Sequence, residues 1–126
     1  MRLPAVFAAL ALSTLTPTAL MAHVQLAAST PAADAEAKAP KVIVLTFSAP
    51  VDQTSTAASI IMTAMPGMAN HGEMPIRNFT TNWSADGKTL TLTLKKPLPT
   101  GSYDVRWQAA GADGHGVSGT LAFTVD

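Results

Sequence analysis

Methionine recurs at every third position over one short segment of the chain, and a histidine follows in the same phase. The members of this pattern are Met62, Met65, Met68, His71 and Met74. A spacing of three departs from the 3.6-residue period of a helix, and Pro66, Gly67, Gly72 and Pro75 also oppose helix formation. We therefore expect a loop that curls these side chains around one point.

The donor atoms of this segment suit a particular metal ion. Thioether sulfur is a soft, neutral ligand that favours copper(I), and one imidazole adds a borderline donor. The alternative is that the methionines fill gaps in a hydrophobic core, which is their commonest role. Because proline and glycine are interleaved with them and a histidine is in phase, the pattern favours a copper(I) site.

His23 is a second candidate ligand, and its value depends on proteolytic processing. A histidine at a free N-terminus offers its α-amine and its imidazole Nδ1 to one ion, a nitrogen pair that suits tetragonal copper(II). Inside a longer precursor the same residue lacks the amine. It would then be an ordinary exposed histidine.

A third candidate is the segment Asp113-Gly114-His115. Residues two apart in an extended segment project to the same face, so the carboxylate and the imidazole could reach one ion together. Asp-Gly is also a common turn pair, as at Asp86-Gly87, so Asp113 could serve the turn alone. The three histidines of the chain all fall in these candidate sites. An amine, two imidazoles and a carboxylate would suit square-planar copper(II).

The first 22 residues have the features of a secretory signal peptide. Arg2 supplies a positive charge, residues 3–12 are apolar, and Ala22 is a small residue at the expected cleavage point. Leu20 is a poor third-last residue, so cleavage after Ala19 competes with cleavage after Ala22. We expect a signal peptide over residues 1–22 and one domain over residues 23–126, exported to the periplasm.

Composition excludes several classes of protein. The 126 residues include eight basic and eight acidic side chains, which cancel, and no run of Lys or Arg that would bind nucleic acid. No apolar run reaches the roughly 18 residues of a spanning helix. The absence of cysteine means that the domain must fold on its own core without disulfides.

Short stretches in which apolar and polar residues alternate make up much of the rest of the chain, and these stretches must position the candidate ligands. In one of them Leu90, Leu92 and Leu94 alternate with threonines, which places three leucines on one face. The turn at residues 85–88 predicts a hairpin between the stretches at residues 79–83 and 90–94. The expected strands cover residues 42–47, 59–62, 79–83, 90–94, 103–108 and 121–125. This pattern of six or seven strands predicts an all-β antiparallel sandwich or small Greek-key barrel.

Several motifs along the chain resemble the CopC-like periplasmic copper-binding proteins, which are linked to copper resistance and homeostasis. They are Ala22-His23, Ser29-Thr30-Pro31-Ala32, Val44-Leu45-Thr46-Phe47-Ser48 with Pro50-Val51, Leu98-Pro99-Thr100-Gly101-Ser102-Tyr103 with Val105-Arg106-Trp107, and Ala112-Asp113-Gly114-His115-Gly116-Val117-Ser118-Gly119 with Phe123-Thr124-Val125. The resemblance implies an immunoglobulin or cupredoxin-like Greek-key fold of about seven strands. It also implies copper(II) ligation by the amine and side chain of His23, by Asp113 and by His115, and copper(I) ligation by the Met-rich loop. Many members keep only the first site, so the loop indicates a two-site version.

These observations favour a monomeric, non-catalytic copper carrier or buffer that passes the metal to an inner-membrane transporter or another periplasmic copper protein. Two other classes remain open. Secreted copper mono-oxygenases also use an N-terminal histidine brace on a β-sandwich, but they need open coordination positions and a flat aromatic surface. A metal-free adhesion module would explain the fold but neither the methionines nor the histidines.

Overall fold

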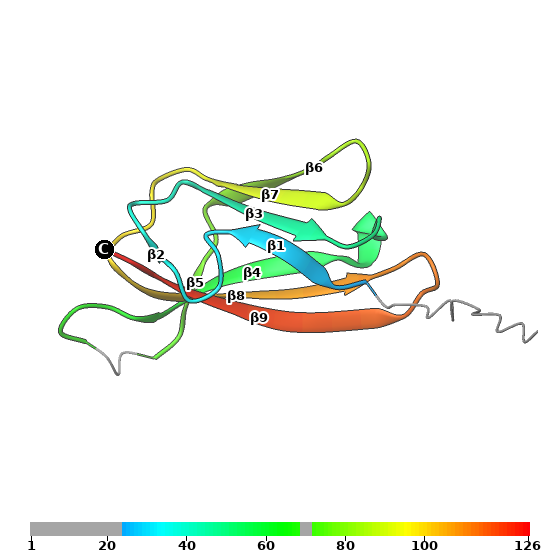
Figure 1. The fold of residues 1–126 in the computed structure, drawn as a ribbon. Coiled ribbons are helices and arrows are strands. Elements are labelled where there is room, and N and C mark those ends of the chain that lie inside the picture. Colours follow the sequence, from blue (N-terminus) through cyan, green and yellow to red (C-terminus); the bar gives the residue numbers. More distant parts are fainter. Residues whose placement is uncertain (1–23, 69–71) are drawn as a thin grey trace, which may run out of the picture.

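The structure is a computed structural model that describes residues 24–68 and 72–126. Two β-sheets pack face to face in an open sandwich (Figure 1). The expected signal peptide, His23 and His71 lie outside the described residues. Within the described ranges there is no helix long and apolar enough to cross a membrane.

The first sheet has four antiparallel strands. Its order is β1 (Leu26–Thr30), β3 (Val42–Phe47), β7 (Thr89–Leu94) and β6 (Phe79–Trp83). The leucines of β7 face the core and are at most 2% exposed. The turn between β6 and β7 forms as the sequence predicts, because Gly87 adopts a positive φ of 72° and the Asp86 carboxylate accepts a hydrogen bond from the Lys88 amide.

The second sheet carries the candidate metal ligands at its two ends. Its order is β2 (Glu36–Ala37), β9 (Gly116–Val125), β8 (Gly101–Ala110), β4 (Ala57–Ala64) and β5 (Met74–Ile76). The β2–β9 pair is parallel and the other three pairs are antiparallel. One turn of 3₁₀ helix, Gln53–Ser55, leads into β4 and is capped by the Asp52 side chain.

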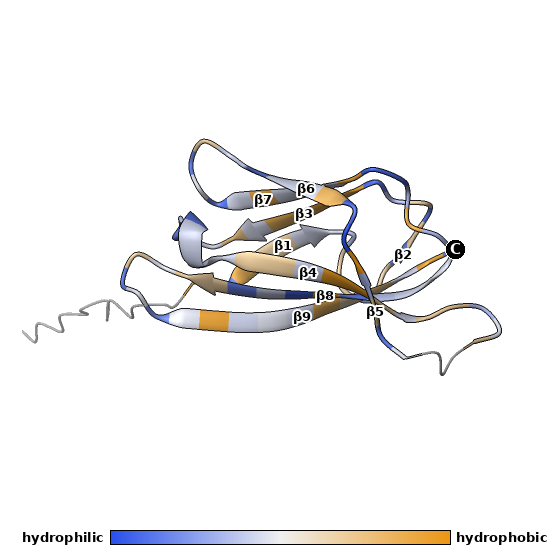
Figure 2. Ribbon diagram, turned by 180° about the vertical axis from the view of Figure 1, so that it is seen from behind, coloured by the Kyte–Doolittle hydropathy of each residue, from blue (hydrophilic) through white to orange (hydrophobic). Residues whose placement is uncertain are grey.

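Side chains from both sheets interlock in one core. Hydrophobic and hydrophilic residues are interspersed along the strands (Figure 2). In β3, β7 and the second half of β9, buried residues alternate with more exposed ones, so these strands present an apolar face inward. The Tyr103 and Phe123 rings stack with centroids 5.6 Å apart, and Phe47 meets Trp107 edge-on at 5.5 Å. This core stabilises a domain that contains no cysteine and so no disulfide.

Tyr103 also fixes the entry to β8. Its side chain is 1% exposed, and its hydroxyl donates a 2.6 Å hydrogen bond to the Pro99 carbonyl four residues upstream. Burial raises the pKa of Tyr103 to about 12, so the hydroxyl keeps its proton at physiological pH. This is the geometry of the tyrosine corner of immunoglobulin-like sandwiches.

The substitution Tyr103→Phe tests this hydrogen bond. The ring stays, but the Pro99 carbonyl loses its donor, so the free energy of unfolding should fall by about 1 kcal/mol. Denaturant unfolding of the metal-free protein measures the change. An unaltered midpoint and slope would show that the hydrogen bond adds nothing to stability.

The expected fold class is confirmed, and the sandwich rather than the barrel is the form that occurs. All six expected stretches lie in strands, but the described residues form nine strands rather than about seven. The strands without a clear sequence signal are β1, β2 and β5. They are an edge strand rich in small residues, a two-residue pairing, and an edge strand that contains Pro75, a residue that edge strands tolerate.

The described members of the two sets of candidate ligands lie at opposite ends of the sandwich. The loop that joins β4 to β5 projects from one end, beyond the C-terminus (Figure 1). The β8–β9 turn lies at the other end, where the chain enters β1 (Figure 1). Because the strands between them are up to ten residues long, one ion cannot contact both sets.

Candidate functional site

The tight turn between β8 and β9 brings Asp113 and His115 into contact. Gly114, with φ of 82°, allows the chain to reverse, and its amide donates a 3.0 Å hydrogen bond to the Gly111 carbonyl. The Asp113 Oδ1 atom accepts a 3.0 Å hydrogen bond from the His115 backbone amide. Its Oδ2 atom lies 3.0 Å from Nδ1 of the His115 ring.

This contact orients the imidazole for metal binding. When Nδ1 carries a proton, it donates that proton to the carboxylate; when Nδ1 is unprotonated, its electron pair and the Asp113 oxygen face the same point, where both can bind one ion. The carboxylate thereby fixes the orientation of the ring beside it. The Asp113 side chain is 28% exposed and that of His115 is 67% exposed, so an ion from solvent can reach the pair.

The start of the described chain packs against the same turn. Val24 is 5% exposed, and a Cβ atom built on Gly111 would lie 2.9 Å from Val24 Cγ2 and 3.3 Å from Asp113 Oδ1. Gly111 therefore leaves the room that Val24 and the Asp113 carboxylate occupy. The described part of the chain therefore begins beside this turn. Sequence reasoning missed both Val24 and Gly111, because only the folded chain brings them together.

The methionine-rich segment forms a loop, as its prolines and glycines predict. Met65 to Met68 make a tight turn that is closed by a 3.0 Å hydrogen bond from the Met68 amide to the Met65 carbonyl. Pro66 and Gly67 occupy the central positions, and Gly67 has a φ of 77°, the pattern of a type II turn. The three-residue spacing thus places Met65 and Met68 at the two ends of one turn, side by side.

The methionines differ sharply in exposure. Met68 is 54% exposed and Met74 is 46% exposed, whereas Met62 is 3% exposed and belongs to the hydrophobic core. Met65 is partly buried against that core. Met62 and Met74 are paired across β4 and β5, but the Met62 side chain packs inward, near Gly101. Met62 therefore fits the core interpretation, and the other three methionines stand where an ion can reach them.

No described group of three or more His, Cys, Asp or Glu side chains could hold a metal ion. Asp113 and His115 supply two donors, and the remaining donors expected from the sequence, His23 and His71, lie outside residues 24–68 and 72–126. The thioethers of Met65, Met68 and Met74 are a different kind of donor, suited to softer ions.

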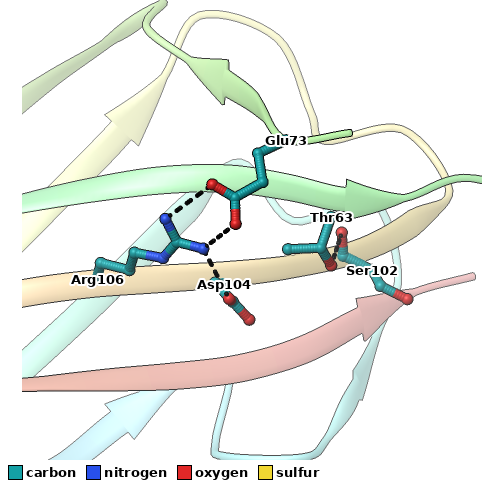
Figure 3. A network of polar contacts seen from close by, with 5 residues as sticks. All are labelled: Thr63, Glu73, Ser102, Asp104 and Arg106. Carbon is teal, nitrogen blue, oxygen red and sulfur yellow. Dashed lines mark hydrogen bonds and ion pairs between the residues drawn. The ribbon is translucent and has the colours of Figure 1, made fainter. Parts of the chain in front are cut away.

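An ion-pair network at the base of the methionine loop was not anticipated (Figure 3). The Arg106 guanidinium donates to both carboxylate oxygens of Glu73, with Nη1 to Oε1 at 3.1 Å, and its Nη2 lies 3.5 Å from Asp104 Oδ2. Hydrogen bonding and charge from Arg106 lower the pKa of Glu73, and Glu73 in turn raises the pKa of Arg106. The sequence contained two signals for this ion pair: the carboxylate of Glu73 within the methionine-rich segment, and the cation of Arg106 on the polar face of the stretch that forms β8.

Comparison with known proteins relates this chain to a protein family. The CopC domain matches residues 26–126. The chain is 38% identical over 105 residues to Copper resistance protein C of Escherichia coli, which covers 83% of this chain and 82% of that protein. It is also 38% identical over 104 residues to Copper resistance protein C of Pseudomonas syringae pv. tomato, with 82% and 81% covered.

Solved structures agree with the sequence matches. The crystal structure of PcoC, a methionine-rich copper resistance protein from Escherichia coli, superimposes with a TM-score of 0.74 at 35% identity, covering 83% of this chain and 100% of that one. CopC from Methylosinus trichosporium OB3b superimposes with a TM-score of 0.65 at 28% identity, covering 82% and 94%. With one domain family matched over residues 26–126 and relatives covered along most of their length, the chain belongs to the CopC family.

Proposed function

We propose that this protein is a non-catalytic periplasmic copper carrier or buffer that serves copper resistance and holds copper(II) and copper(I) at separate sites. The observation that carries the proposal is the pair of donor sets at opposite ends of the sandwich (Figure 1). One has oxygen and nitrogen donors and the other has thioethers, the division that the two oxidation states prefer. The copper resistance proteins among its relatives support the assignment.

The copper(II) site consists of the α-amine and imidazole of His23 with Asp113 and His115. It forms once the signal peptide, which directs the protein to the periplasm, is removed after Ala22. Two observations support this set: Asp113 and His115 are in contact, and Val24, the residue after His23 in the sequence, packs against Gly111 of the same turn.

The copper(I) site consists of the thioethers of Met65, Met68 and Met74 with the imidazole of His71. Met62, which shares the spacing of these residues, is assigned to the core below the loop because it is 3% exposed. The exposure of Met68 and Met74 suits transfer of copper(I) to an inner-membrane copper transporter or another periplasmic copper protein. The protein acts as a monomer.

The mono-oxygenase alternative receives less support. Such an enzyme needs a flat aromatic surface beside its histidine brace. The six aromatic residues beyond position 23 lie in the core or pack against it, and the large apolar side chains exposed in the described ranges are Val42, Met68 and Met74. Asp113 would also fill a coordination position that oxygen requires.

Reduction should move the metal from one end of the molecule to the other. X-ray absorption of mature protein loaded with one equivalent of copper(II) should show nitrogen and oxygen neighbours before ascorbate is added. Afterwards it should show mainly sulfur, because copper(I) prefers thioethers. A variant with Met65→Leu and Met68→Leu is the control and should not acquire the sulfur signal. A reduced wild-type spectrum still dominated by nitrogen and oxygen would contradict the two-site proposal.

A further inference from the structure

Glu73 connects the methionine loop, which joins β4 to β5, to strand β8 on the other side of β4. It immediately precedes Met74, the first residue of β5, whereas Arg106 lies in β8. Strand β4 runs between β5 and β8, so the ion pair crosses the outer face of β4 (Figure 3). The loop arm that leads into β5 is thereby attached to the longer β8 strand.

The geometry of this contact is specific. Both guanidinium branches engage Glu73, which is the two-pronged arrangement that a planar guanidinium favours. Asp104 lies two residues before Arg106 on the same face of β8, and its carboxylate holds the guanidinium from the side opposite Glu73. The Arg106 side chain is thus held between Asp104 of its own strand and Glu73 of the loop.

The other arm of the loop is also attached to β8. The register between β4 and β8 shifts between Met62 and Ala64, and at this irregularity the Thr63 hydroxyl donates a 3.3 Å hydrogen bond to the Ser102 carbonyl. Both arms therefore meet β8 at the base of the loop (Figure 3). The Met65–Met68 turn directly follows the end of β4, and Met74 begins β5 directly after Glu73.

We propose that Arg106 is a positioning residue for copper(I): by holding Glu73, it keeps Met74 in register with the Met65–Met68 turn. This inference rests on the proposed copper(I) site. Arg106 does not touch the metal. It raises the fraction of molecules whose loop arms are correctly spaced, and the apparent affinity of a ligand scales with that fraction.

Copper(I) affinity of the mature protein, measured by competition with a chromophoric copper(I) chelator, tests the role. Arg106→Gln and Glu73→Gln should each weaken copper(I) binding by roughly two- to fivefold, the scale of an exposed ion pair. Arg106→Lys should recover part of the loss, because it keeps the charge without the two-pronged contact. Arg77→Gln is the matched control, since Arg77 is an exposed arginine just after β5 with no ion pair among the described residues, and it should bind as wild type does.

Ionic strength separates positioning from a general structural effect. Sodium perchlorate should weaken copper(I) binding by the wild-type protein, because salt screens an exposed ion pair, and should have little effect on Arg106→Gln. Copper(II) affinity should be the same in wild type and Arg106→Gln, and the melting temperature of the metal-free protein should fall by no more than the loss of one exposed ion pair explains.

Two results would overturn the inference, and they differ in what else they overturn. If Arg106→Gln binds copper(I) as tightly as wild type while Met65→Leu with Met68→Leu loses binding, Arg106 has no positioning role and the copper(I) site stands. If the methionine variant also keeps its affinity, the proposed copper(I) site fails, and the role of Arg106 fails with it.

Discussion

Adding a single alanine ahead of His23 in the mature protein should weaken copper(II) binding by roughly a hundredfold or more. The extension converts the α-amine into a peptide nitrogen and so removes one half of the expected chelate. Loss of a partner outside the coordination sphere already costs about 10- to 100-fold in metal affinity, and loss of a ligand should cost more. Val24 is packed against Gly111, which restricts how far the lengthened chain can shift to compensate.

Competition with a copper(II) chelator measures this effect. The extended protein should keep the melting temperature and the copper(I) affinity of the mature protein, because the methionine loop lies at the other end of the sandwich (Figure 1). Mass spectrometry of the exported protein should find His23 as its first residue. Equal copper(II) affinity in the mature and extended forms would rule out the amine as a ligand.

Replacing Met65 and Met68 together with leucine should abolish most copper(I) binding and leave the metal-free fold nearly unchanged. Leucine keeps the apolar volume but has no sulfur, and such exchanges cost less than about 1.5 kcal/mol even in cores. Met68 is 54% exposed, so its replacement should cost less than a core exchange would. Chelator competition and thermal unfolding of the same samples measure the two quantities.

The structure offers a matched control for this experiment. Met62 shares the three-residue spacing but is 3% exposed in the core, so Met62→Leu should alter stability slightly and leave copper(I) affinity intact. If Met62→Leu lowered copper(I) affinity as much as the double variant does, Met62 would be a ligand and the assignment by burial would be wrong. A large stability loss in the double variant with copper(I) affinity preserved would return Met65 and Met68 to the core.

Local patterns were sufficient to predict most of the sandwich. The alternation of leucine and threonine in β7 has the period of a strand, and Gly87 with Asp86 has the chemistry of the turn before it. By contrast, β2 is two residues long and exists only because Glu36 and Ala37 lie beside the end of β9. Such a pairing depends on a neighbour far away in the chain and leaves no periodic signal.

The candidate ligands divide in the same way. The contact of Asp113 with His115 follows from a spacing of two residues around a glycine, and the loop character of the methionine segment follows from its prolines and glycines. The burial of Met62 does not follow, because the three-residue spacing is the same for buried and exposed members. Its burial depends on β4 pairing with β8 and on the core beneath them.

The amino-acid sequence by itself determined the β-strand content, the two kinds of donor and the turns that carry them, because these properties depend on residue type and on neighbours a few positions away. Only the tertiary structure decided that the two donor sets lie at opposite ends, that Val24 packs beside the Asp113 turn, and that Arg106 reaches Glu73. Each of these depends on strands distant in the chain meeting in one register. That register is selected by burial of the shared core.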